Sequence, residues 1–140
     1  EEASKAGVPA IAVDWRGNKD KPDPSVKYVW IDLSNDHGLG EFKQLVTDKN
    51  AGYVPMAPPC GTSSRAREIQ RKGGGPPPLR SEQFPDGLPS LSGKDAERVT
   101  TANTLYRNTV NLVKWLTLKG IAWSIENPQN SLMWLTTPFK

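Results

Sequence analysis

The sequence is organised around the stretch Ala57-Pro58-Pro59-Cys60-Gly61-Thr62-Ser63-Ser64, which contains the chain's single cysteine. A short apolar run, 53–56, precedes it and predicts a β-strand. The two prolines fix the backbone before the sulfur, and the glycine after it allows another group to approach closely. A strand that ends in a rigid turn presenting one thiol is how α/β enzymes display a nucleophile. The alternative interpretation is that Cys60 is an incidental small hydrophobic residue.

Length and composition indicate one small domain with its own core. The chain has 140 residues, of which 36% are hydrophobic, and its mean hydropathy is -0.58. No apolar run reaches the length of a membrane span, and residues 1–5 do not resemble a signal peptide. A single cysteine excludes an internal disulfide and a cysteine-based zinc site. We therefore expect an intracellular location, nuclear in a eukaryote and cytoplasmic in a bacterium or phage.

The hydrophobic pattern predicts alternating strands and helices, and therefore an α/β fold with an open, mostly parallel sheet. Strands are expected at 9–13, 26–33, 53–56 and 121–125. Helices are expected at 2–6, 38–49, 92–119 and 129–135, and Ser34-Asn35-Asp36 offers an N-cap for the second of them. The long helix has the clearest signals, because Ser92 and Asp95 form a capping-box-like start and Gly120 follows its end.

Residues 73–93 form the longest stretch without helix or strand periodicity, and they are rich in glycine and proline. A loop of this length in a compact domain is usually functional or disordered. Glycines allow it to move and prolines oppose regular structure, as a substrate-covering flap requires. A plain flexible insertion is the alternative.

The charge balance is mildly basic, with a formal net charge of +3. Five basic residues follow the cysteine: Arg65, Arg67, Arg71, Lys72 and Arg80. Such a cluster suits a polyanionic partner such as DNA or RNA, and it also suits a solvated protein face.

Four chemically active side chains lie at the C-terminal ends of the expected strands: Asp14, Asp32, Cys60 and Glu126. In open parallel sheets ligands bind beyond these ends, so the sequence predicts a site there. A thiol and a buried carboxylic acid suit nucleophilic attack on a ring that is protonated as it accepts the sulfur. A Cys-His hydrolase would need a histidine base, but the one histidine, His37, is expected on the surface. No metal-ligand cluster and no Gly-x-Gly-x-x-Gly or phosphate-loop motif is present in the sequence.

These residues resemble motifs of the DNA (cytosine-5)-methyltransferases. The 57–64 stretch resembles that family's Pro-Cys nucleophile motif, and Glu126-Asn127-Pro128 resembles its Glu-Asn-Val motif in the Glu-Asn-Pro form of phage-type members. Asp14-Trp15 resembles the acidic-aromatic pair whose acid binds the cofactor ribose and whose ring packs on adenine. Asp32 resembles the acid that receives the adenine amino group. The four motifs occur in the family's order.

The resemblance implies a Rossmann-like fold dependent on S-adenosylmethionine and a role for each matched residue. Cys60 would add to carbon 6 of a cytosine flipped out of DNA, Glu126 would hold the base, and carbon 5 would take the methyl group from S-adenosylmethionine. The implied cofactor-binding residues are Asp14, Trp15, Asp32 and Pro58. The implied substrate-binding residues are Pro59, Ser64, Arg65, Arg67, Asn127 and Pro128. The 73–93 loop and the arginines would cover the base and contact phosphates.

The chain is similar to only part of that family's catalytic domain. The family's first strand with its Phe-x-Gly-x-Gly loop, its Gln-x-Arg-x-Arg motif, its recognition region and its final strands have no counterpart in the sequence, and Gly61 replaces a usual glutamine. In that fold the first strand lies between the strands that end at Asp14 and Cys60, so its loss would split the sheet. We interpret residues 1–140 as a partial methyltransferase domain with a mobile loop at 73–93, expected to be inactive in isolation. The alternative is a non-catalytic remnant or a nucleic-acid-binding module from a mobile element.

Overall fold

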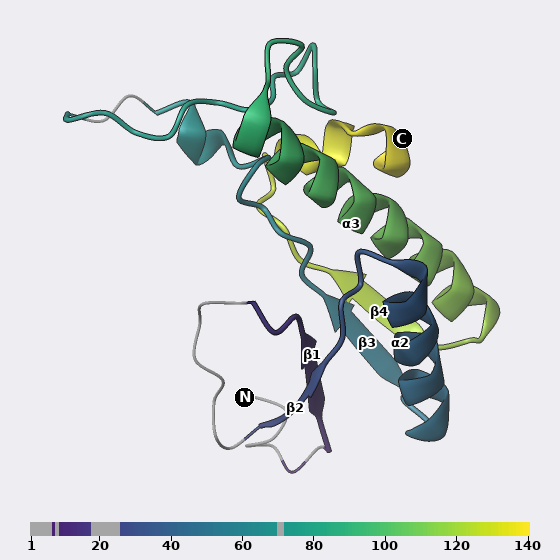
Figure 1. The fold of residues 1–140 in the computed structure, drawn as a ribbon. Helices are drawn as coiled ribbons and strands as arrows, with labels where there is room; N and C mark the ends of the chain where they lie inside the picture. Colours follow the sequence, from purple (N-terminus) through teal and green to yellow (C-terminus); the bar gives the residue numbers. More distant parts are fainter. Residues whose placement is uncertain (1–6, 8, 18–25, 70–71) are drawn as a thin grey trace. The chain divides into compact units, whose positions relative to one another are not determined.

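The structure is a computed structural model that describes residues 7, 9–17, 26–69 and 72–140. It divides into two compact units, Glu1–Asn50 and Ala51–Lys140, which we describe separately (Figure 1). The helix expected at 2–6 lies outside the described residues. No helix within the described ranges is both long and apolar enough to cross a membrane.

The first unit contains two parallel strands and one helix. Strand β1 (Ile11–Asp14) pairs with β2 (Lys27–Trp30), and the first residues of the two strands are opposite one another. Helix α2 (Asp36–Asp48) begins after Asn35, whose side-chain oxygen accepts a hydrogen bond from the Gly38 backbone N–H at 2.9 Å. The N-cap predicted at 34–36 is thereby confirmed. The buried residues of the helix lie on one face: Gly38, Leu39, Phe42 and Val46.

Gly38 is required by a close approach between α2 and the chain after β2. A Cβ atom at this position would overlap the backbone carbonyl of Asp32 and lie 3.3 Å from the Ile31 side chain. An alanine in a helix normally stabilises by about 0.5–1 kcal/mol relative to glycine, but a forced backbone shift costs about 1–3 kcal/mol.

We therefore expect Gly38→Ala to lower the free energy of unfolding, measured by urea denaturation. Gly40→Ala is the matched control, because Gly40 lies in the same helix and a Cβ there meets no atom within 4 Å. Gly40→Ala should leave the stability unchanged or raise it slightly. Equal stability of the two variants would contradict the proposed close approach.

The second unit has a strand–crossover–strand arrangement. Strand β3 (Tyr53–Met56) pairs in parallel with β4 (Ala122–Ile125), with Tyr53 opposite Ala122 and Met56 opposite Ile125. Between them the chain forms a turn, a short 3-10 helix η1 (Arg65–Arg67), an irregular stretch and helix α3 (Gly93–Leu118), which runs alongside the strand pair (Figure 1).

The core of the second unit joins α3 to the C-terminal segment. Two 3-10 helices, η2 (Leu132–Leu135) and η3 (Thr137–Phe139), lie beside α3 at the yellow end of the ribbon (Figure 1). Ala102, Tyr106 and Met133 form the buried centre of this core, and Ile125, Trp134 and Phe139 pack against it. The irregular stretch is attached to this core, because Leu79 and Arg80 are both 1% exposed.

The structure confirms a mixed α/β fold with parallel strand pairing, and it corrects three details. The described strands form two separate two-stranded sheets, where the alternation of strands and helices predicted one open sheet and the resemblance implied a split sheet. Ser92 occupies the N-cap position of α3 but makes no side-chain cap, so the capping box is wrong. The helix expected at 129–135 is replaced by η2 and η3, which are 3-10 helices. The absence of helix and strand is confirmed for 72–92.

Candidate active site

Parallel pairing of β3 and β4 places the two principal candidate residues after neighbouring strand ends. The Glu126 backbone N–H continues the pairing and donates a hydrogen bond to the Met56 carbonyl at 2.8 Å. Cys60 lies in the turn that follows β3, and both Cys60 and Glu126 are exposed. The exposure of Glu126 corrects the expectation of a buried carboxylic acid.

The backbone before Cys60 is held by two side chains from distant parts of the unit. The Asn127 side-chain amide donates to the Pro58 carbonyl at 2.8 Å, and the Tyr106 hydroxyl donates to the Pro59 carbonyl at 2.8 Å. Asn127 follows β4 and Tyr106 lies in the middle of α3, where it is fully buried. The turn is thus fixed from the strand side and from the helix side.

The backbone after Cys60 is held just as closely. The Cys60 carbonyl accepts hydrogen bonds from the backbone N–H groups of Ser63 and Ser64, at 3.0 and 2.8 Å. The Gly61 carbonyl accepts from the Arg67 guanidinium at 2.6 Å. These bonds close a tight turn, and Cys60 itself remains exposed.

Ser63 connects this turn to the core. It is 1% exposed, and its backbone carbonyl accepts from the Leu132 N–H at 2.9 Å. Its hydroxyl accepts from the Ser131 hydroxyl at 3.0 Å and lies 2.9 Å from the Tyr106 hydroxyl oxygen. The Ser63 hydroxyl also lies 3.4 Å from the Cys60 carbonyl, to which it can donate. The turn, α3 and the chain before η2 therefore form one polar network.

Arg80 is a buried cation beneath the same turn. Its guanidinium donates to the Thr62 hydroxyl oxygen from Nε at 3.2 Å and from Nη2 at 3.0 Å. Nη1 donates to the Pro85 carbonyl at 2.6 Å and to the Asn103 side-chain oxygen at 2.7 Å. The group also lies 5.4 Å from the centre of the Tyr106 ring, a cation–π distance. Burial lowers the pKa of Arg80, and electrostatic interactions with Tyr106 and Asp86 partly oppose that shift.

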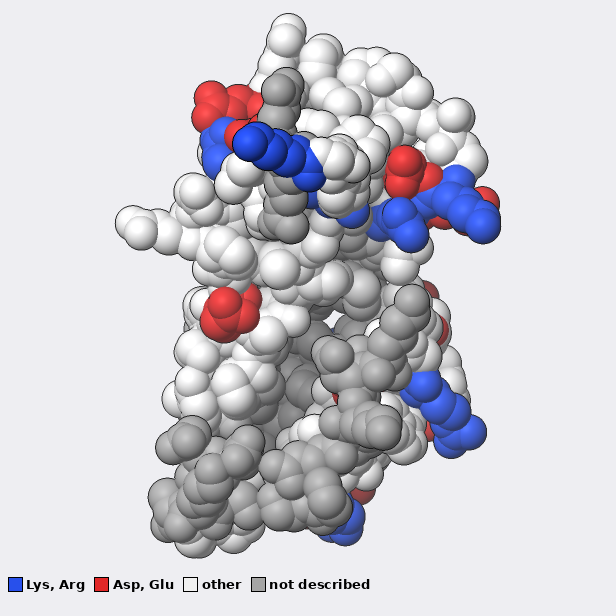
Figure 2. Space-filling model, turned by 90° about the vertical axis from the view of Figure 1, so that its left-hand side faces the viewer, with Lys and Arg blue, Asp and Glu red and all other residues white. Residues whose placement is uncertain are grey.

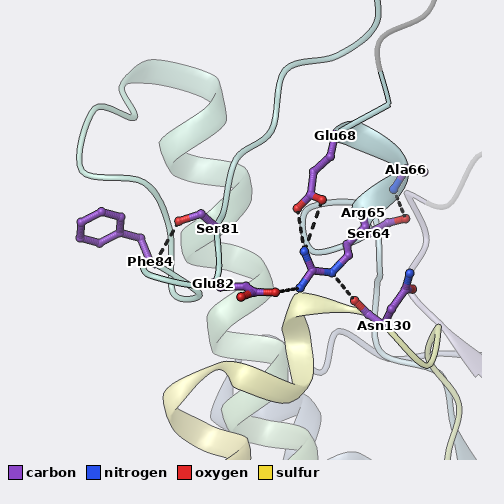
Figure 3. Close-up of polar contacts among 8 residues, drawn as sticks. All are labelled: Ser64, Arg65, Ala66, Glu68, Ser81, Glu82, Phe84 and Asn130. Carbon is purple, nitrogen blue, oxygen red and sulfur yellow. Dashed lines mark hydrogen bonds and ion pairs between the residues drawn. The ribbon is translucent and has the colours of Figure 1, made fainter.

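The arginines expected to contact substrate have intramolecular partners. Figure 3 shows the Arg65 guanidinium reaching the carboxylates of Glu68 and Glu82 and the backbone carbonyl of Asn130. Arg67 donates to the carbonyls of Gly61 and Pro77. Their substrate-binding role stays a prediction that requires these bonds to be exchanged. On the face drawn in Figure 2, described basic and acidic residues lie side by side without forming a continuous basic surface.

The other implied substrate residues lie close to the turn. Ser64 is the N-cap of η1 and accepts from the Ala66 N–H at 3.2 Å (Figure 3). Pro59 is exposed, Pro58 is buried and Pro128 is half-buried. The Asn127 side-chain oxygen is buried without a hydrogen-bond partner among the described residues.

The implied cofactor residues of the first unit lie at the ends of β1 and β2. Asp14 ends β1, and its backbone carbonyl accepts from the Ile31 N–H at 2.9 Å, so the Asp32 carboxylate follows at the same sheet edge. Trp15 is 58% exposed, and its ring covers Gly17, where a Cβ would overlap it. Hydrogen bonds from the Ser34 hydroxyl and from its backbone N–H lower the pKa of Asp32. Two carboxylates and an exposed indole fit the hydroxyls, amino group and purine face of an adenosine.

The structure thus groups the four predicted strand-end residues as two pairs, one in each unit. His37 is exposed and lies in α2 of the first unit, 3.5 Å from Glu41, which fits the surface position expected for it. Among the described residues no three His, Cys, Asp or Glu side chains gather as a metal ion would need. The sequence reasoning missed Tyr106, Ser63 and Arg80, because their role comes from contacts between positions far apart in the chain.

No protein-family model, no curated protein and no solved structure matches this chain.

Proposed function

We propose that this protein carries the nucleophile and base-binding segment of a cytosine C5-methyltransferase that uses S-adenosylmethionine. The observation that carries the proposal is the turn around Cys60. An exposed thiol is presented on a backbone held by Asn127 and Tyr106, and Asn127 directly follows the exposed Glu126. Positioning of this kind is what a nucleophile needs, because fixed geometry lowers the entropic part of the barrier.

The chemistry assigned to Cys60 is addition and elimination. The thiolate forms a bond to carbon 6 of the cytosine ring, and the ring electrons shift toward carbon 5, which becomes the nucleophile. S-adenosylmethionine, when bound, supplies the methyl group that carbon 5 takes up. Loss of the carbon 5 proton to a base and cleavage of the sulfur–carbon 6 bond then restore the ring and the thiolate.

Glu126 is assigned the recognition of the base. Its carboxylate, in reach of the turn through the β3–β4 pairing, would hold the ring nitrogen and the exocyclic amine of cytosine. A base seated against Glu126 would remove water from it and so favour the protonated, hydrogen-bonded ring that accepts the sulfur. Glu126 is exposed, so a base can reach its carboxylate.

The first unit is assigned the adenosine half of the cofactor. Asp14 and Asp32 would accept hydrogen bonds from the ribose hydroxyls and the adenine amino group, and Trp15 would stack on the purine. Two separate parallel strand pairs are also what a methyltransferase sheet would give without its central strand.

The test is covalent trapping. The protein, with any sequence that flanks residues 1–140 in its gene, is incubated with S-adenosylmethionine and DNA containing 5-fluorocytosine, in which fluorine replaces the proton that must leave. We expect a protein–DNA adduct that mass spectrometry places on Cys60 and that is absent in Cys60→Ser. Because Cys60 is the only cysteine, iodoacetamide labelling verifies the accessible thiol in the same sample. A labelled, folded protein that forms no adduct would reject methyl transfer and favour a nucleic-acid-binding module.

A further inference from the structure

A hollow of about 460 Å³ lies beside the turn that carries Cys60. Pro59, Gly61 and Thr62 form its turn side, and the first part of α3 forms its other side, with Lys94, Glu97 and Arg98. Its walls therefore include residues on both sides of the nucleophile in sequence. The proposed chemistry at Cys60 and Glu126 does not use this hollow.

Thr62 lines this hollow, and its hydroxyl group has a proton available for a further hydrogen bond. A threonine hydroxyl has one proton and two acceptor lone pairs. In Thr62 the oxygen accepts from both Nε and Nη2 of Arg80, which is 1% exposed. The hydroxyl proton cannot point at the guanidinium, because two N–H groups of a cation already face the oxygen there. No acceptor for this proton is found among the described residues.

The hydroxyl of Thr62 is also polarised. A hydrogen bond to a charged donor is stronger than one between neutral groups, and such bonds reinforce one another when they form a chain. The buried charge of Arg80 thus makes the Thr62 proton a better donor to whatever lies in the hollow. Hydrogen bonds to Pro85 and Asn103 hold the Arg80 guanidinium in place against Thr62.

We propose that the hollow is a subsite for a phosphate of the nucleic-acid backbone, held by the Thr62 hydroxyl together with Lys94 and Arg98. A phosphate is anionic and only accepts hydrogen bonds. It therefore matches a polarised hydroxyl on the turn side of the hollow and two cationic side chains on the α3 side. Glu97 also lines the hollow, and Arg98 forms an ion pair with Asp95 at 3.3 Å. A phosphate bound there would receive the Thr62 proton and would exchange with Asp95 for the Arg98 guanidinium.

This inference rests on the proposed function, because it takes the target of Cys60 to be a base in a nucleic acid. It adds what holds the backbone next to that base. A phosphate fixed beside the turn would position the attached nucleotide against Cys60 without any contact to the base itself. Arg80 is then a positioning residue that acts through Thr62.

The test is the salt dependence of binding to a short single-stranded DNA oligonucleotide containing cytosine, measured by fluorescence anisotropy. Each phosphate contact of a single strand contributes about 0.7 to the slope of log affinity against log salt. We expect Lys94→Gln and Arg98→Gln each to reduce this slope, by up to about that amount. Arg107→Gln is the matched control, because Arg107 is exposed on α3 and does not line the hollow.

Thr62 is tested by an isosteric pair of variants. Thr62→Val removes the hydroxyl and should weaken binding roughly tenfold, whereas Thr62→Ser keeps it and should bind as the wild type does. Circular dichroism reports whether Thr62→Val folds, and if it does not, the salt slopes of Lys94→Gln and Arg98→Gln decide alone. Unchanged slopes in both of these variants would overturn the subsite.

The two proposals fail in different ways. If Cys60 forms the adduct but the Lys94 and Arg98 variants keep the wild-type slope, the subsite is wrong and methyl transfer stands. If the slopes fall as expected in a protein that forms no adduct, the subsite stands and methyl transfer is wrong. If inorganic phosphate alone displaced the oligonucleotide with an affinity equal to that of the oligonucleotide, the assignment to a nucleic-acid backbone would be wrong.

Discussion

Glu126→Gln is expected to slow adduct formation with 5-fluorocytosine DNA by about 100- to 10,000-fold, the range typical for removal of a general acid or base. Glutamine keeps the shape of the side chain but cannot carry the negative charge that favours a protonated cytosine ring. Glu126 is exposed, so its replacement should change the free energy of unfolding by no more than about 0.5 kcal/mol. The effect is therefore one on chemistry and not on folding.

Two reactions at the Cys60 sulfur separate an effect of Glu126 on base recognition from an effect on the thiol. Alkylation of Cys60 by iodoacetamide needs a thiolate but no base recognition, so Glu126→Gln should be alkylated at the wild-type rate. Gln129→Glu or Gln129→Ala is a neutral-site control, since Gln129 is also exposed and follows the same motif. If Glu126→Gln slowed both reactions equally, Glu126 would act on the thiol and its assignment to the cytosine would be wrong.

The local features that sequence predicted well are those governed by short-range rules. Strand β3 has the predicted bounds, because an apolar run is limited by Gly52 on one side and by two prolines on the other. Asn35 caps α2 because its side chain accepts a hydrogen bond from the N–H group three residues later, and this contact depends only on neighbouring residues. Glu126 beside the Cys60 turn followed from parallel pairing of two apolar runs.

The features that sequence did not predict depend on long-range contacts. Arg80 looked like one more surface cation after the cysteine, and its burial depends on Thr62, Asn103 and the Tyr106 ring meeting around it. The pattern Ser92 to Asp95 satisfied a capping rule, yet the Ser92 side chain makes no cap in the structure. Periodicity within each run does not reveal whether two strand pairs join into one sheet, because this depends on a partner strand; only the resemblance implied the split.

Tyr106→Phe is expected to lower the free energy of unfolding of the second unit by about 1–3 kcal/mol, the usual cost of leaving buried polar groups unsatisfied. The phenyl ring would keep the packing against Ala102 and Met133, so the change isolates the hydroxyl. Without it the Pro59 carbonyl loses its donor and the Ser63 hydroxyl loses one of its hydrogen-bond partners, both in a region where Tyr106 is 0% exposed.

Tyr53→Phe is the matched control, because it removes the same atom from a strand of the same unit at a site that is 56% exposed. Tyr53 shares a hydrogen bond with Ser124, and water can replace that partner, so its loss should cost no more than about 0.5 kcal/mol. Urea denaturation of the two variants gives the comparison. Equal stability of Tyr106→Phe and Tyr53→Phe would mean that the turn does not depend on the Tyr106 hydroxyl.

The same substitution links stability to function at Cys60. Tyr106 fixes the carbonyl of Pro59, the residue next to the nucleophile, so its loss frees the thiol to sample positions that do not face a base. We expect Tyr106→Phe to slow adduct formation with 5-fluorocytosine DNA and to leave iodoacetamide alkylation unchanged or faster, because a small reagent does not require a fixed sulfur. A purely structural role would leave the rate of adduct formation, divided by the rate of alkylation, at its wild-type value. A fall in that ratio identifies the hydroxyl as the group that orients Cys60 toward its target.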